Sequence, residues 1–314
     1  MSTFVFTPEP PNHWDAVCST YSALFHSPGW QSVLNQAFGS QTMYGWNAGA
    51  QTGVAITVFK VGPFRVGYVG FPIGGAIGAS PLEPTMVLGW QKAYFPAKLH
   101  CLRFPVSAFN TPMALDLPCQ KTPETAILEL QEWQITNLPK LRRDIKKASS
   151  TGLQVIDAQS PAQGNILHRF YRDTVLRHGG KLRYNVGYFS SLISLAQRHP
   201  GLRCLLAILD EEVVGFLIVV LHARTAYYLH GAANPSLKQL SPSDVLLHEA
   251  INWAQDKDMD CFNMMPSPSH QTSLVRYKEK WGGITKQQQV FDLAVKPFHS
   301  LAFRMAERLY RLMW

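Results

Sequence analysis

The sequence has few cysteines and none of the spacings that commonly hold a metal. Its five cysteines are odd in number and widely separated, and neither CxxC nor HExxH occurs in the 314 residues. We therefore expect neither a disulfide framework nor a structural or catalytic metal. Cys204 and Cys261 stand in apolar strand patterns, where reduced cysteines of a cytoplasmic protein are often found.

Signals for secretion and for membrane insertion are also missing. The first residues, MSTFVFTPEPPNHW, lack the basic start and apolar core of a signal peptide. The longest apolar run, Val213–Leu221, is far shorter than the ~20 residues that a membrane-spanning helix needs. Together with the cysteine usage, these absences predict a cytoplasmic location.

What is present is an ordinary apolar content with an excess of positive charge. Apolar residues make up 46% of the chain and charged residues 16%, and 29 Lys and Arg against 21 Asp and Glu give a net charge of +8. The length fits two domains of about 150 residues each. The positive charge favours an anionic partner such as RNA, phosphate or a lipid headgroup, and no feature indicates DNA.

The N-terminal part has the pattern of an α/β domain without a recognisable catalytic residue. Ser27-Pro28-Gly29 precedes apolar residues at helical spacing, which are Trp30, Val33, Leu34 and Ala37. Further elements are expected as strands at 53–61, 64–70 and 99–104 and as a helix at 83–95.

The character of the sequence changes near Thr122. Thr122 followed by Pro123 predicts the start of a helix, with threonine as N-cap and proline at the first position. A second helix, ending at Gly152, carries a basic set made of Arg142, Arg143, Lys146 and Lys147. These residues form either a solvated charged face or a contact with the phosphates of a bulky anionic substrate.

The rest of the chain alternates between helices and strands. Helices are expected at 162–178, 188–198, 241–254 and 272–281, and strands at 203–209, 213–222, 225–231, 261–265 and 285–295. Asp210–Glu212 joins two of the strands as an antiparallel hairpin. Ser241-Pro242-Ser243-Asp244 has the spacing of a capping box at a helix start, where a phosphate or an acyl carrier can dock.

Three segments of this part resemble the Fem-type branch of the GNAT acyltransferase superfamily. They are Leu229-His230-Gly231-Ala232-Ala233-Asn234-Pro235, Leu246-Leu247-His248-Glu249-Ala250-Ile251-Asn252-Trp253-Ala254 and Tyr277-Lys278-Glu279-Lys280-Trp281-Gly282-Gly283. The basic helix starting at Leu141 is similar to one characteristic of that branch. The resemblance implies an α/β fold with two tandem GNAT-like domains, at 1–120 and 121–296, and a C-terminal helix at 297–314 that packs on the first domain.

The resemblance also implies where a donor would bind, with one departure. Ordinary acetyltransferases hold the coenzyme A pyrophosphate with an Arg/Gln-x-x-Gly-x-Gly/Ala loop, and here that stretch is Gln239-Leu240-Ser241-Pro242-Ser243-Asp244. Both glycines are replaced, Pro242 removes an amide donor, and Asp244 would repel a pyrophosphate. Ser241 and Ser243 are the residues left to line a phosphate site.

The candidate catalytic residues are Lys278, Tyr277 and His230. In the Fem-type pattern the lysine aids binding and polarisation of the acyl group, so Lys278 would supply positive charge near the developing oxyanion; otherwise it is a surface lysine. Tyr277 is otherwise a packing residue. His230, at the end of a strand, is the best histidine for a base or a substrate contact. A polar cluster around Gly179-Gly180 indicates a substrate loop and comprises His178, Lys181, Arg183 and Tyr184.

The resulting hypothesis is an N-acyltransferase acting in bacterial cell-envelope or surface-polymer (for example peptidoglycan) biosynthesis. Its co-substrate would be acyl-coenzyme A or aminoacyl-tRNA, no tightly bound cofactor is expected, and the acceptor would be a small molecule or an envelope precursor. The alternatives are a scaffold that has kept the fold and lost catalysis, and a tRNA-binding module. The sequence does not identify the oligomeric state.

The last segment has the pattern of a basic amphipathic helix. From Phe298 onward its apolar residues are Leu301, Met305, Leu309 and Leu312, interleaved with Arg304, Arg308 and Arg311. We expect the apolar side to pack on the protein itself, with a peripheral membrane contact as the alternative.

Overall fold

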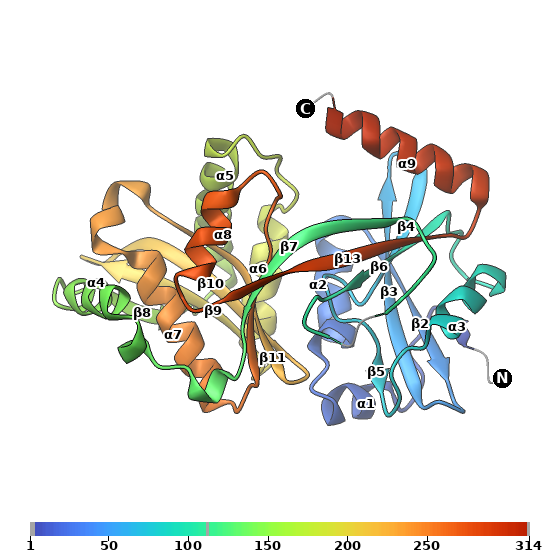
Figure 1. The fold of residues 1–314 in the computed structure, drawn as a ribbon, viewed down its shortest axis with the longest axis horizontal. Helices are drawn as coiled ribbons and strands as arrows, with labels where there is room; N and C mark the ends of the chain where they lie inside the picture. The colour runs from blue at the N-terminus through green and yellow to red at the C-terminus, as the bar shows by residue number, and fades with distance from the viewer. Residues whose placement is uncertain (1–3, 111–112, 313–314) are drawn as a thin grey trace. The chain divides into compact units, whose positions relative to one another are not determined.

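The computed structural model describes residues 4–110 and 113–312, which divide into two compact units. Unit 1 contains the residues up to Thr122 and those from Gln287 onward, and unit 2 is the single stretch Pro123–Lys286. The chain passes from one unit to the other within strands β7 (Cys119–Ile127) and β13 (Ile284–Ala294) (Figure 1).

Unit 1 is a mixed sheet with short helices. Its strands follow the order β1-β2-β3-β4-β6-β13, in which β4 and β6 are parallel and the other neighbours are antiparallel. Its other elements are β1 (Val5–Thr7), α1 (Trp14–Thr20), α2 (Pro28–Phe38), β2 (Gln41–Asn47), β3 (Thr52–Val61), β4 (Phe64–Val69), β5 (Ile77–Gly78), α3 (Pro84–Gly89), β6 (Cys101–Val106) and α9 (Pro297–Leu312).

Helix α2 begins and ends where its sequence signals lie. The Ser27 hydroxyl accepts a hydrogen bond from the backbone N–H of Trp30 at 3.2 Å, and Gly39 ends the helix in the left-handed conformation. The predicted apolar stripe, with Trp30 and Leu34 at its centre, is buried. The prediction of this helix is confirmed.

Helix α9 packs within unit 1 through one side. Phe303 is buried against the Phe64 ring at 5.5 Å. The buried Arg103 guanidinium of β6 donates to both carboxylate oxygens of Asp292 in β13 and of Glu307 in α9, at 2.8–2.9 Å. The C-terminal helix therefore lies on the N-terminal unit, but the expectation that its predicted apolar side packs on the protein is wrong for Leu301 and Met305, which are 50% and 58% exposed because Phe303 and Glu307, on the other side of the helix, make the contacts. Leu309 and Leu312, which belong to the same prediction, lie outside the described side chains.

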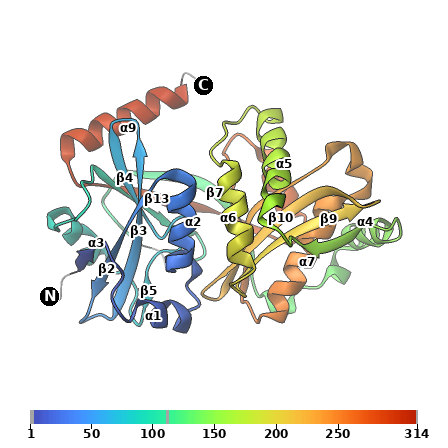
Figure 2. The same cartoon turned by 180° about the vertical axis from the view of Figure 1, so that it is seen from behind.

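Unit 2 is a second mixed sheet, in the order β7-β12-β11-β10-β9-β8. Helices α5 and α6 cover one face (Figure 2) and α7 covers the other (Figure 1). Its elements are α4 (Pro139–Ser149), β8 (Gln154–Asp157), α5 (Gly164–Arg177), α6 (Val186–Ala196), β9 (Leu202–Leu209), β10 (Glu212–His222), β11 (Thr225–Ala233), α7 (Pro242–Asp256), β12 (Cys261–Pro266) and α8 (Thr272–Glu279), with short 3-10 turns that include η6 (Pro235–Leu240).

The strands β11 and β12 are parallel, joined by α7, and paired over three residues. The pairing runs from Thr225–Cys261 to Tyr227–Asn263, after which the strands separate. Both are irregular at that point: β11 has a bulge at Leu229, and β12 loses register with β7 between Asn263 and Pro266. Beyond Tyr227 and Asn263 the two strands are no longer paired with each other.

Two predictions about the middle and the end of the chain are wrong. The segment expected as a helix from Thr122 is strand β7, because Ala126 and Ile127 are buried and pair with β12, which outweighs the local cap signal. The domain expected at 121–296 also extends too far, since residues 289–294 of β13 pair with β6 in unit 1.

None of the helices in the described part of the chain is long and apolar enough to cross a bilayer. Within residues 4–110 and 113–312, no three potential metal ligands are grouped together.

Candidate active site

A cavity of about 890 Å³ lies at the start of α7 in unit 2. Its walls come from the end of β11, the turn η6, the first residues of α4 and α7, and the side chains of Tyr277 and Lys280 from the α8 region. Three lysines line it, Lys140, Lys238 and Lys280. Two aspartates, Asp144 and Asp244, also line it, so the lining has a small excess of positive charge, which favours an anionic ligand.

The two serines predicted to line a phosphate site, Ser241 and Ser243, both lie in the cavity wall. Ser241 is in the left-handed conformation (φ 48°) and its side chain makes no capping hydrogen bond, so the predicted capping box is wrong. The acidic residue of that motif bonds elsewhere: the Asp244 carboxylate accepts from Lys280 Nζ at 3.0 and 3.1 Å. This pairing offsets the negative charge that we expected to repel a phosphate.

Tyr277 lines this cavity, and the ammonium group of Lys280 lies over its ring. Lys280 Nζ is 4.6 Å from the centre of its ring. Burial raises the pKa of Tyr277 well above its ordinary value, and the Asp244 charge acts in the same direction. The phenol is therefore protonated at neutral pH, and its one proton is hydrogen-bonded to the Asp244 carboxylate.

Lys278, the next residue, points away from solvent. It is 3% exposed, and its Nζ donates to the carbonyl oxygen of Met265 at 2.6 Å and to Ser267 Oγ at 2.8 Å. Met265 lies at the end of β12, and Ser267 directly follows that strand. Burial lowers the pKa of Lys278 to about 7, and the nearby Glu124 carboxylate opposes that shift.

A chain of buried hydrogen bonds fixes this end of β12. Asn263 Nδ2 donates to Glu124 Oε1 at 2.7 Å, and Asn263 Oδ1 accepts from the Met265 N–H at 2.7 Å. Met265 is in the left-handed conformation (φ 61°), which turns its carbonyl toward Lys278. Asn263 thus connects Glu124 to the backbone of Met265, whose carbonyl accepts from Lys278. Glu124 and Ser267 were not predicted.

His230 lies on the opposite face of the sheet, among aromatic rings. The bulge at Leu229 directs it toward α5 and α6, where its Nε2 is 3.1 Å from the Tyr188 hydroxyl. The ring of Tyr184, from the predicted substrate loop, is 4.6 Å from the imidazole centre. Burial lowers the pKa of His230 to about 3, so the imidazole is neutral at physiological pH.

Two other residues of the predicted substrate loop, Lys181 and Arg183, lie on the surface. The side chains of Lys181 and Arg183 are exposed, and the backbone N–H of Arg183 donates to the Tyr171 hydroxyl at 2.9 Å. Of the loop cluster, the structure brings Tyr184 to His230.

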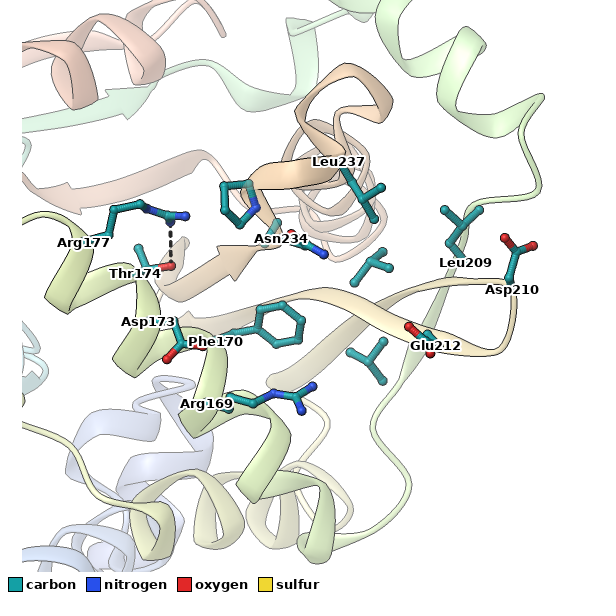
Figure 3. Close-up of a pocket in the computed structure, with 14 residues that line it drawn as sticks. Arg169, Phe170, Asp173, Thr174, Arg177, Leu209, Asp210, Glu212, Asn234 and Leu237 are labelled. Atoms are coloured by element: carbon teal, nitrogen blue, oxygen red, sulfur yellow. Dashed lines mark hydrogen bonds between the residues drawn. The ribbon is translucent and has the colours of Figure 1, made fainter.

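A second cavity, of about 630 Å³, lies between α5 and the start of β10 (Figure 3). Arg169, Asp173 and Arg177 project from one side of α5, and Glu212 lies across from them. The residues Ala233, Asn234 and Pro235 line both cavities. The end of β11 is therefore a shared wall.

The predicted basic set on α4 does not enter the first cavity. Arg142, Arg143, Lys146 and Lys147 are exposed, whereas the wall is formed by Lys140, Leu141 and Asp144 of the same helix. The basic side of α4 is thus an exposed surface of the helix whose first turn lines the cavity.

Comparison with known proteins identifies the architecture. Residues 138–279 match the family described as acetyltransferase (GNAT) domain. A crystal structure of FemX superposes with a TM-score of 0.67 at 12% identity, covering 95% of this chain and 99% of FemX. The search of curated proteins gives no significant match.

Two further structures cover nearly the whole chain. The C-terminal domain of a putative lysylphosphatidylglycerol synthetase from Agrobacterium fabrum has a TM-score of 0.60 at 14% identity over 94% of this chain and 96% of its own. A tandem GNAT protein from the clavulanic acid biosynthesis pathway has a TM-score of 0.52 at 9% identity over 94% and 99%. The prediction of an α/β fold with two tandem GNAT-like domains is confirmed.

Proposed function

We propose that this chain is an N-acyltransferase of the Fem-type branch of the GNAT superfamily and moves an acyl or aminoacyl group from a phosphate-bearing carrier to an amine; the GNAT domain match and the fold shared with FemX support this. One observation carries the proposal: Lys140, Lys238, Lys280 and Tyr277 line one cavity at the start of α7, and the residue that follows Tyr277, the buried Lys278, donates to the Met265 carbonyl at the end of β12.

The reaction needs few groups. The amine nitrogen attacks the acyl carbonyl, a C–N bond forms, and the C–S or C–O bond to the carrier breaks. Negative charge develops on the carbonyl oxygen, and one proton must leave the nitrogen. With a pKa of about 7, Lys278 exchanges a proton at neutral pH, and we assign it as the group that takes the amine proton. Protonated Lys278 then places positive charge beside the oxyanion.

The donor is the part of the proposal that the cavity defines best. Lys140, Lys238 and the Lys280–Asp244 pair support binding of phosphates, with Ser241 and Ser243 as hydrogen-bond donors. The exposed basic side of α4 begins where the cavity ends, which supports a carrier longer than the cavity. Acyl-coenzyme A and aminoacyl-tRNA both fit this description.

The acceptor is proposed from the relatives. FemX and a putative lysylphosphatidylglycerol synthetase share the fold, so we infer an acceptor from the cell envelope, such as a peptidoglycan precursor. His230 with Tyr184 and Tyr188 is the polar group that we assign to acceptor binding on the α5 and α6 side. We also propose a cytoplasmic location, which the five unpaired cysteines support.

The test is transfer of radiolabelled acyl groups from acetyl-coenzyme A and from charged tRNAs to a panel of amine-bearing envelope precursors. Lys278→Met should lower kcat about 10²–10⁴-fold with little change in the donor KM, because it removes proton transfer and leaves the cavity intact. Lys238→Glu should raise the donor KM. The exposed Lys257→Met is the matched control for Lys278→Met. Full activity of Lys278→Met would exclude the assigned role.

A non-catalytic carrier-binding protein is the second candidate. It is favoured by the way Lys278 is already bonded to Met265 and Ser267. It predicts donor binding with no turnover and no effect of Lys278→Met on that binding. A plain tRNA-binding module predicts instead that uncharged tRNA binds with steep salt dependence and that charge reversal on α4 abolishes binding.

A further inference from the structure

Helix α9 has an apolar stripe on the side turned away from unit 1. Phe298 is 87% exposed, Leu301 50% and Met305 58%, and their spacing places them in one row along the helix. Figure 1 shows α9 as a long helix at the margin of unit 1. Three large apolar side chains in a row are more than the scattered exposure that protein surfaces normally have.

This stripe is separate from the side that packs on the protein. The packing side consists of Phe303, Ser300 and Glu307, which are turned toward β6 and the β3–β4 hairpin. Because that side already anchors the helix, the outer stripe is not required for folding.

The charge beside the stripe has one sign. Arg304 and Arg308 lie along one margin of the row, and Lys296 and His299 are exposed at the start of the helix. Among the described side chains of α9, Glu307 is the one carboxylate, and it is bonded to the buried Arg103. The surface around the stripe is therefore basic, and the Glu307 carboxylate is turned toward Arg103 on the packing side.

These features favour one occupant over another. A second copy of the chain would bring arginines against arginines, and three side chains cover much less than the ~800 Å² per partner of a stable interface. An anionic bilayer matches both the apolar row and the charge, since interfacial helices bury an apolar side at the headgroup level with cations above it. We propose that α9 docks this protein on the surface of an anionic membrane.

Vesicle co-sedimentation of the full chain tests the proposal. The protein should bind vesicles of phosphatidylglycerol and phosphatidylcholine, and bind pure phosphatidylcholine vesicles far more weakly. Changing Phe298, Leu301 and Met305 together to Gln should weaken the partition more than tenfold. Changing Arg304 and Arg308 to Gln should weaken it about fivefold for each arginine.

Matched variants separate docking from other effects. Leu176→Gln, at an equally exposed leucine of α5 in unit 2, should bind like the wild type. Since all three stripe residues are exposed, their Gln variant should keep the wild-type circular dichroism and melting temperature. No binding to anionic vesicles, or equal binding of the triple variant, would overturn the proposal. So would a concentration-dependent dimer in sedimentation analysis that the triple variant loses.

Discussion

Replacing Lys278 with Met should change how the stability of the protein depends on pH. In the wild type, burial lowers the pKa of Lys278 from 10.5 to about 7, whereas in the unfolded chain the amine keeps its ordinary pKa. Between pH 7 and 10.5 the unfolded state therefore binds a proton that the native state does not. In that window the wild type should gain stability as the pH rises.

The size of the effect follows from the pKa values. Each pH unit inside the window contributes about 1.4 kcal/mol, so the interval from pH 7.5 to 9.5 contributes about 2.7 kcal/mol. Lys278→Met has no proton to bind in either state and lacks this term. It also leaves the Met265 carbonyl and Ser267 Oγ without their donor, at about 1–3 kcal/mol each, a cost that does not vary with pH.

Urea unfolding of both proteins, followed by tryptophan fluorescence and circular dichroism at half-unit pH steps, measures the difference. Taking wild type minus variant removes the contributions of the buried cysteines and tyrosines, which titrate in both proteins. The difference should rise with pH, while wild type minus Lys257→Met should stay flat because that lysine is exposed. Parallel curves for wild type and Lys278→Met would show that Lys278 keeps its proton in the folded protein.

Two further predictions concern packing. Asp292→Ala should destabilise unit 1 by about 3–5 kcal/mol in urea unfolding, because the buried Arg103 loses one of its two carboxylates. The double variant Asp292→Ala with Arg103→Met should recover part of that loss of stability. Additive effects of the two substitutions would contradict this reasoning. Gly164→Ala should destabilise unit 2 by about 1–3 kcal/mol, since a Cβ there would lie 2.6 Å from the backbone nitrogen of Ser190. Gly89→Ala is the control: a Cβ there would meet open space, so this variant should be more stable than the wild type by about 0.5 kcal/mol. Equal melting temperatures of the two variants would contradict the packing argument.

The parts of the fold that sequence predicted well are those that local chemistry controls. The Ser27 cap and the apolar stripe after it lie within eleven residues and specify α2. The β9–β10 hairpin follows from two apolar runs joined at Asp210–Glu212, and its antiparallel pairing is confirmed. The parallel pair β11 and β12 follows from the helix between them.

The parts that sequence missed depend on partners far along the chain. Thr122-Pro123 has the local pattern of a helix start, yet the segment is a strand because β12, more than 130 residues later, pairs with it. For the same reason Glu124 gave no signal as a site residue: its contact with Asn263 spans 139 positions. The basic set on α4 is exposed and does not line the cavity, whereas Lys140, which precedes it, does; its contact with substrate phosphates stays a prediction.

The division of the chain has a consequence for the order of folding during synthesis. Unit 2 is one uninterrupted stretch and is complete once Lys286 has left the ribosome, whereas unit 1 must wait for β13 and α9. Until then β6 lacks its neighbour β13, and Arg103 has neither Asp292 nor Glu307 to pair with. Domains usually become stable in the order in which they are made. Here the segment that is translated first becomes stable last.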